Sequence, residues 1–186
     1  MMKATRTFFY VSLVLVLITG CSYIMRTDRD LVRASYIAAD LLLKGVKDIR
    51  SLKPRHYGIY TKQPFLVASF VNIDDLQQSS TFGRIVAEQI GSRIAQKGYK
   101  VIELKLRTSS VFVQQHTGEL LLSRELREIS LQHDAYAVVV GTYAASKEVV
   151  YVTAKLVRTE DSVILSSSDY SLPVGPDTKY MLRKGR

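Results

Sequence analysis

The stretch FLVASFV, residues 65–71, followed after a polar connection by TFGRIVAEQIGSRIAQK, residues 81–97, decides the fold class of this 186-residue chain. The first segment is short and continuously apolar, which is typical of a strand buried on both faces of a sheet. In the second segment Phe82, Val86 and Ile90 recur at helical spacing. An apolar strand followed by an amphipathic helix predicts a layered domain in which helices pack on a sheet.

The ends of this helix carry residues that favour helix termini. Ser79, Ser80 or Thr81 can cap its start, because a side-chain hydroxyl accepts a hydrogen bond from a free backbone N–H. Gly98 stands where a left-handed residue commonly ends a helix. We therefore expect a helix over residues 81–97 and the next strand at 99–106.

The other elements follow from periodicity and turn residues. The pattern predicts a helix from the N-cap Asp30 to about Val46, a short apolar segment at 118–122, a helix from Ser123 to about His133, and strands at 135–143, 149–158 and 163–172. The order α-β-α-β-α-β-β-β predicts a single mixed α/β (α+β) domain. Helical crossovers make its first strands parallel, and tight connections make its last strands an antiparallel meander.

The first expected helix is amphipathic. The apolar residues at three- and four-residue spacings are Leu31, Ala34, Ile37, Ala38, Leu41, Leu42 and Val46.

The N-terminal residues have the layout of a bacterial export signal. A short segment with Lys3 and Arg6 precedes an apolar run at residues 8–18. Eleven residues rise about 16 Å as a helix, which is too short to span a bilayer. Residues 18–21, Ile-Thr-Gly-Cys, resemble the lipobox of bacterial lipoproteins. The resemblance implies cleavage before Cys21, diacylglycerol on its sulfur and acylation of its new amino group. The alternative is a signal peptide whose last residue happens to be cysteine.

Four segments are therefore expected. They are a cleaved lipoprotein signal peptide at 1–20, a short lipid-tethered linker at 21–29, the α/β domain at 30–172, and a basic, disordered tail at 173–186. Cleavage would remove two basic residues and no acid, which changes the formal charge from +9 to +7. With a single cysteine, no disulfide can form within the chain.

The positive charge raises the question of an anionic partner. Nucleic acid is not expected, because an exported protein rarely meets it. Anionic lipid headgroups, lipopolysaccharide or an acidic face of another envelope protein are better candidates. The alternative is that the charge mainly favours solubility.

No motif for catalysis or for a cofactor is present among those with a known mechanism. His56, His116 and His133 are far apart in the sequence, so no metal site, no cofactor and no enzymatic activity are expected. The most enzyme-like feature is Asp74-Asp75 followed by Ser79-Ser80-Thr81. The acids could hold a cation and the hydroxyls a phosphate at a helix N-terminus. We favour the interpretation that the aspartates form a turn and that Ser80 or Thr81 caps the helix.

Two charged pairs are candidates for partner contact. Arg84 and Glu88 are four residues apart on the polar side of the 81–97 helix, and Glu119 and Arg124 flank the apolar segment 120–122. Each pair is either a solvated ion pair or part of a docking surface.

Several blocks resemble the FlgO family of outer-membrane flagellar lipoproteins. They occur in order between residues 64 and 172, and the most distinctive are SSTFGR at 79–84, GELLLSR at 118–124 and VGTY at 140–143. The resemblance implies a protein that supports flagellar assembly or stability and motility, without known catalysis. It also implies a domain similar to the amino-terminal domain of the Tol translocation protein and to curli-secretion lipoproteins.

We therefore expect a structural module held by lipid at Cys21 on the periplasmic leaflet of the outer membrane. Its expected partners are flagellar basal-body or other envelope proteins, with a homo-oligomer possible. Ser22 stands where an aspartate would resemble the inner-membrane retention signal. The alternative is a periplasmic lipoprotein that binds and activates a cell-wall synthase. That role requires a long linker, whereas the nine residues 21–29 reach roughly 30 Å.

Overall fold

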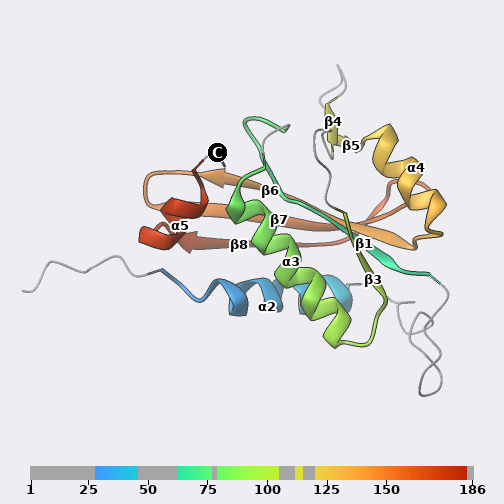
Figure 1. Ribbon diagram of the computed structural model, residues 1–186, viewed down its shortest axis with the longest axis horizontal. Coiled ribbons are helices and arrows are strands. Elements are labelled where there is room, and N and C mark those ends of the chain that lie inside the picture. The colour runs from blue at the N-terminus through green and yellow to red at the C-terminus, as the bar shows by residue number, and fades with distance from the viewer. Residues whose placement is uncertain (1–27, 46–62, 77–78, 105–111, 115–119, 184–186) are drawn as a thin grey trace, which may run out of the picture.

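The computed structural model describes residues 28–45, 63–76, 79–104, 112–114 and 120–183, and a six-stranded sheet runs through its centre (Figure 1). The sheet order is β3-β1-β6-β7-β8, and the short strand β2 pairs with β6. The strands are β1 (Phe65–Ala68), β2 (Val71–Asn72), β3 (Val101–Leu104), β6 (Ala137–Ala145), β7 (Val149–Arg158) and β8 (Ile164–Pro173).

The pairing of the strands confirms the predicted mixed sheet. β1 lies between β3 and β6 and is parallel to both, with Phe65 opposite Val101 on one side and Ala137 on the other. β6, β7 and β8 form an antiparallel meander. β6 is central, as its unbroken apolar run predicts.

The helices are α2 (Leu31–Lys44), α3 (Thr81–Gln96), α4 (Arg124–Gln132) and α5 (Pro176–Met181). A separate antiparallel hairpin consists of β4 (Phe112–Gln114) and β5 (Leu120–Leu122). The predicted N-caps are confirmed, because side chains of Asp30, Ser80 and Ser123 each accept a backbone N–H of the helix that follows. Gly98 is left-handed, with φ +88°, as expected after α3.

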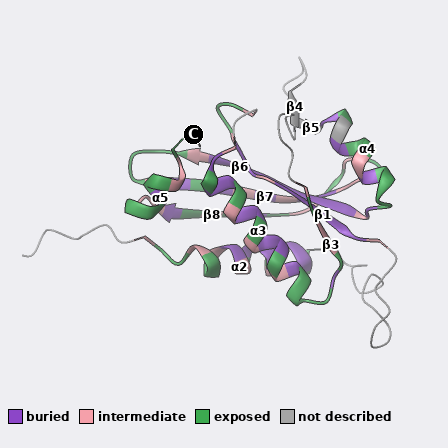
Figure 2. Ribbon diagram, in the orientation of Figure 1, coloured by how far each residue is buried: buried purple, intermediate pink, exposed green. Residues whose placement is uncertain are grey.

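The core has two parts, one on each face of the sheet (Figure 2). Phe65 and Val67 face α2 and α3, whereas Leu66 and Ala68 face the side of Leu126 in α4. Successive side chains of a strand point to opposite faces, so β1 needs apolar residues at every position. This explains why the first core strand shows no polar alternation.

A charged cluster joins α2 to α3. The Asp40 carboxylate accepts hydrogen bonds from Arg93 Nε at 3.1 Å and Arg93 Nη2 at 2.8 Å, and Lys97 Nζ lies 3.2 Å away. The Arg93 guanidinium also lies over the Tyr36 ring, 5.3 Å from its centroid. The hydrogen bond from Arg93, with further help from Lys97, lowers the pKa of Asp40 below its ordinary value although burial opposes this. The Asp40–Arg93 ion pair therefore links α2 to α3.

One expectation from the sequence is wrong: the tail from residue 173 is expected to be disordered, but β8 continues to Pro173 and residues 176–181 form α5. The expected amphipathic helix is present as α2, and its apolar side is only partly buried, because Ile37 is 53% exposed and Leu41 46% exposed while Leu42 is buried. In the described residues no helix has the length and apolar character needed to cross a membrane.

Candidate functional site

The chain reverses direction after β2 in a turn that contains both candidate aspartates. The Asn72 side-chain oxygen accepts the backbone N–H of Asp74 at 3.0 Å, and the Asn72 carbonyl accepts the N–H of Asp75 at 3.2 Å. Both aspartates are exposed. This is the geometry of a side-chain-supported turn, which favours the turn interpretation of these residues.

The candidate hydroxyls lie beside this turn and are used in local structure. Ser79 Oγ donates to the Phe70 carbonyl at 3.1 Å, and the buried Ser80 Oγ accepts the backbone N–H of Gly83 at 3.2 Å. Thr81 is exposed, and its hydroxyl accepts a hydrogen bond from Arg84 Nη2 at 3.1 Å. The structure therefore brings together the serines, the threonine and Arg84 around the first turn of α3.

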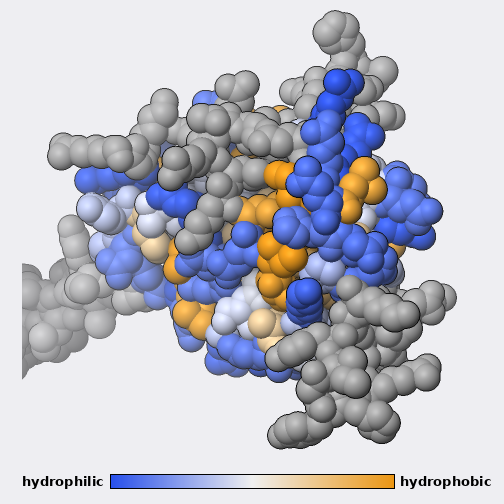
Figure 3. Space-filling model, turned by 45° about the vertical axis from the view of Figure 1, so that its right-hand side comes forward, coloured by the Kyte–Doolittle hydropathy of each residue, from blue (hydrophilic) through white to orange (hydrophobic). Residues whose placement is uncertain are grey.

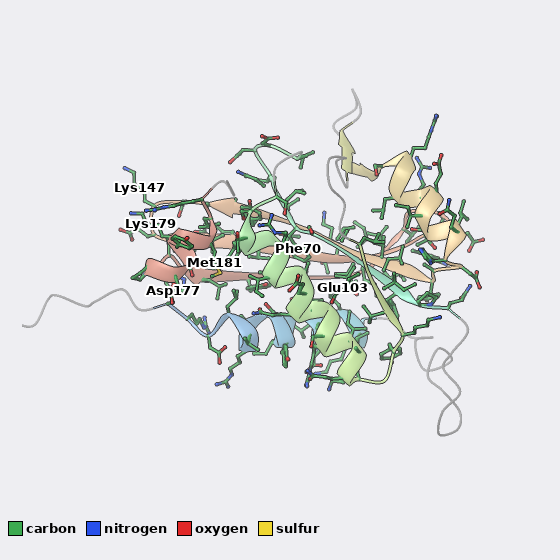
Figure 4. The ribbon with its side chains drawn as sticks, viewed as in Figure 1. Phe70, Glu103, Lys147, Asp177, Lys179 and Met181 are labelled. Atoms are coloured by element: carbon green, nitrogen blue, oxygen red, sulfur yellow. The ribbon has the colours of Figure 1, made fainter. Side chains whose placement is uncertain are left out.

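Phe70 is the buried centre of this region (Figure 4). Its backbone N–H donates to the Gly83 carbonyl at 3.2 Å. A Cβ atom at Gly83 would overlap the Phe70 carbonyl oxygen, and a Cβ atom at Gly141 would overlap the Phe70 ring. Gly83 of the SSTFGR block and Gly141 of the VGTY block thus both leave room for Phe70, because only glycine lacks a Cβ atom.

Tyr143 completes the region from the neighbouring strand. Its ring packs edge-on against Phe82, with centroids 5.5 Å apart. Burial raises the pKa of the Tyr143 hydroxyl, and the nearby Ser80 and Arg84 oppose this rise. Tyr143 is not among the site residues expected from the sequence, although it ends the distinctive VGTY block.

The chemistry available at this end of the sheet is limited. The Ser79 hydroxyl donates its only proton to the Phe70 carbonyl, and the Ser80 hydroxyl is buried beneath the helix that it caps, so neither is presented to a phosphate in this arrangement. No cluster of His, Cys, Asp or Glu able to hold a metal ion occurs within the described ranges. The Phe70 region is therefore a structural clamp that joins β1, α3 and β6.

The other candidate residues are not gathered into one site. Arg84 and Glu88 are both exposed on α3, but no ion pair joins them in the described part of the chain. Arg124 is the exposed first residue of α4. Cys21 and Glu119 lie outside the described residues, so their predicted roles stay predictions.

The structure adds a surface that is not expected from the sequence. The open sheet face consists of the outward residues of β7 and β8, which are Tyr151, Thr153, Lys155, Ser167, Asp169 and Ser171. Tyr151 is 58% exposed, and α4 covers a different part of this side of the sheet, at Val138, Val140 and Val157. The alternation of polar and apolar residues in VVYVTAKLV indicates such a face, because alternate side chains of a strand point to opposite sides of the sheet.

Comparisons with known proteins match this architecture. The model of the family described as FlgO protein matches residues 37–177. The LpoB C-terminal domain from Salmonella enterica is similar in fold, with a TM-score of 0.52 at 12% identity, covering 79% of this chain and 99% of that chain. The LpoB C-terminal domain from Escherichia coli gives a TM-score of 0.47 at 13% identity, with coverage of 79% and 99%. Among curated proteins, none matches this sequence.

Proposed function

The chain belongs to the FlgO family, and from that premise we propose that it is a lipid-anchored structural and interaction module that supports flagellar assembly or stability and, through it, motility. The observation that carries this proposal is the family match over residues 37–177, which includes α3, β6, β7 and β8. The matched part contains the Phe70 clamp and the whole meander.

The proposed attachment is through lipid on Cys21. The apolar run before this cysteine and the Ile-Thr-Gly-Cys motif support it. Several acyl chains, at about 0.8 kcal/mol per buried CH₂, hold a protein on a bilayer essentially permanently. With Ser22 next to the cysteine, the proposed location is the periplasmic leaflet of the outer membrane.

The proposed role requires contacts and no catalysis. The Ser79 hydroxyl donates to the Phe70 carbonyl, Ser80 caps α3, and the aspartates lie in a turn. Among the described residues, exposed surfaces for contact include the open sheet face and the polar side of α3 with Arg84 and Glu88. Either surface could join a flagellar basal-body protein, another envelope protein or a second copy of this chain.

The alternative function is that of a periplasmic lipoprotein that binds and activates a cell-wall synthase. The likeness to LpoB is a likeness of fold at 12% identity and does not separate the two roles. The length of the linker between Cys21 and the first helix helps to distinguish the two roles. A linker of nine residues spans roughly 30 Å at most, which favours a partner close to the membrane.

Site-specific crosslinking in intact cells tests the proposed role. A photoreactive residue placed at Tyr151 samples the open sheet face, one at Glu88 samples α3, and one at Asp74 in the turn serves as a control. We expect crosslinks from Tyr151 or Glu88, but not from Asp74, to a flagellar rod or ring protein identified by mass spectrometry. Crosslinks to a cell-wall synthase instead would replace the flagellar role by the alternative.

A further inference from the structure

The first described residue of the chain is fixed to the C-terminal helix. The Asp28 carboxylate accepts the backbone N–H groups of Asp177 at 2.9 Å and Thr178 at 3.0 Å. A Cβ atom at Gly175 would lie 2.5 Å from the Asp28 carboxyl carbon, so the two segments are in close contact. The chain therefore leaves the domain toward Cys21 at α5 and not at an arbitrary point.

Cys21 is seven residues before this fixed point. Seven residues extend to about 25 Å at most. If Cys21 carries lipid, the end of the domain at α5 is held within that distance of the bilayer. Figure 1 shows α5 at one end of the long axis and α4 at the other. The α5 end is therefore closer to the bilayer than the α4 end.

The side chains at this end suit a bilayer surface. Tyr180 of α5 is 73% exposed, and tyrosine is enriched at membrane interfaces because its ring is apolar and its hydroxyl polar. Exposed basic residues surround this end of the fold, and Figure 4 shows Lys147 and Lys179 there. The described basic residues of this end are Arg29, Lys147, Lys179 and Arg183.

The acidic residues at the same end equal these basic residues in number, so charge does not distinguish this surface. They are Asp28, Asp30, Asp177 and Glu148, and the Asp28 carboxylate is held by α5. On the inner side of α5, Met181 and Leu182 pack against the core, so the helix presents its polar and aromatic side outward.

We propose that the α5 end of the domain, with the exposed Tyr180, lies on the phospholipid surface, so that the domain stands end-on and α4 projects away from the membrane. This inference rests on the lipid anchor of the proposed function and adds an orientation to it. The open sheet face then runs along the side of the molecule, where an envelope protein can reach it. In Figure 3, hydrophobic residues gather mainly near the centre of the side shown, with hydrophilic residues around them.

Tryptophan fluorescence of the full-length lipidated protein tests this orientation. The chain has no tryptophan, so each substitution introduces a single probe. The variants are Tyr180→Trp at the proposed contact, Leu131→Trp on α4 at the far end, Tyr151→Trp on the open sheet face and Ile37→Trp on α2. All four positions are at least half exposed, with 73%, 75%, 58% and 53%. Each protein is reconstituted into vesicles of phosphatidylethanolamine and phosphatidylglycerol in equal parts, with and without brominated acyl chains.

We expect a blue shift and quenching by brominated lipid for the Tyr180→Trp variant only. Unquenched emission at position 180 in protein that floats would overturn the orientation while leaving the anchor intact. Quenching at position 37 instead would place α2 on the lipid, and a blue shift without quenching would indicate a protein contact. Failure to float would contradict the anchor and the orientation together.

Discussion

The carboxylate of Asp28 accepts a hydrogen bond from the backbone N–H of Thr178 at 3.0 Å, across 150 residues of sequence. A second bond, from the N–H of Asp177 at 2.9 Å, makes Asp28 a helix cap supplied from the other end of the chain. Burial opposes the charged form, but the hydrogen bonds from the Thr178 side chain and the backbone of α5 together lower the pKa of Asp28. The order of the C-terminal helix thus depends on an N-terminal residue.

Replacing Asp28 with Ala should loosen α5. Loss of a capping side chain costs about 1 kcal/mol in typical helices, and we expect a decrease of this order in the free energy of unfolding, measured in urea on a full-length chain with Cys21→Ser. Asp28→Asn is the matched control, because its side-chain oxygen still accepts a hydrogen bond. Equal stability of the Ala and Asn variants would contradict the cap.

The same contact predicts a dependence on acid. The pKa of Asp28 is lower in the folded chain than the ordinary value of 3.8. Its contribution to stability is therefore complete above pH 3.8 and is lost as the pH falls through the folded pKa. The difference in stability between the normal chain and Asp28→Asn should shrink below that pH.

Two glycines of helix α3 should respond in opposite ways to Ala. At Gly83 a methyl group would overlap the Phe70 carbonyl oxygen, so Gly83→Ala should destabilise the fold by about 1–3 kcal/mol. At Gly91 the nearest atom, on Val67, would lie at 3.4 Å, an ordinary contact. Because Ala favours helix over Gly, Gly91→Ala should be neutral or stabilising by up to about 1 kcal/mol. Thermal unfolding of the two variants compares them directly, and equal losses would contradict the clamp.

Tyr170 predicts a loss of stability in alkali. Burial raises the pKa of its hydroxyl from 10.0 to about 12, with Ser35 opposing the rise. Above pH 10 the unfolded chain releases this proton while the folded chain keeps it, so stability falls as the pH rises toward about 12. Tyr170→Phe should reduce this slope in urea unfolding measured across that range. An unchanged slope would show that Tyr170 ionises as freely in the folded chain.

Asp74 and Asp75 should be dispensable for function. Because we interpret them as residues of a turn supported by Asn72, Asp74→Ala with Asp75→Ala should leave swimming in soft agar unchanged while the protein accumulates normally. Substitution of Asn72 by Ala is the contrasting variant, because it removes the acceptor of the turn. Loss of swimming by the double Ala variant at normal protein levels would assign these carboxylates a role beyond the turn.

Short-range patterns in the sequence were sufficient for most of the architecture. The bounds expected for β7, residues 149–158, are those observed, because tight turns on both sides fix the ends of a hairpin strand. The caps at Asp30, Ser80 and Ser123 were also predicted, since capping depends on residues three positions apart. Parallel and antiparallel pairing followed from the lengths of the connections.

Features that depend on distant residues could not be predicted. The order of α5 depends on Asp28, and a local sequence pattern cannot predict a capping residue that lies 150 positions away. The exposure of Ile37 and Leu41 depends on how much of α2 is covered by the sheet and α3. The spacing of apolar residues does not predict the extent of this coverage. The need for glycine at positions 83 and 141 became evident only when Phe70 was seen to lie against both.

Swimming of a strain that lacks this protein, complemented with the normal gene or with Cys21→Ser, tests the central claim most directly. If the chain is a lipid-anchored module of the flagellar envelope, the deletion should reduce swimming and the number of filaments. The normal gene should restore both, while the Cys21→Ser protein, exported but not lipidated, should not. Unchanged swimming and filament number in the deletion strain would contradict the flagellar role.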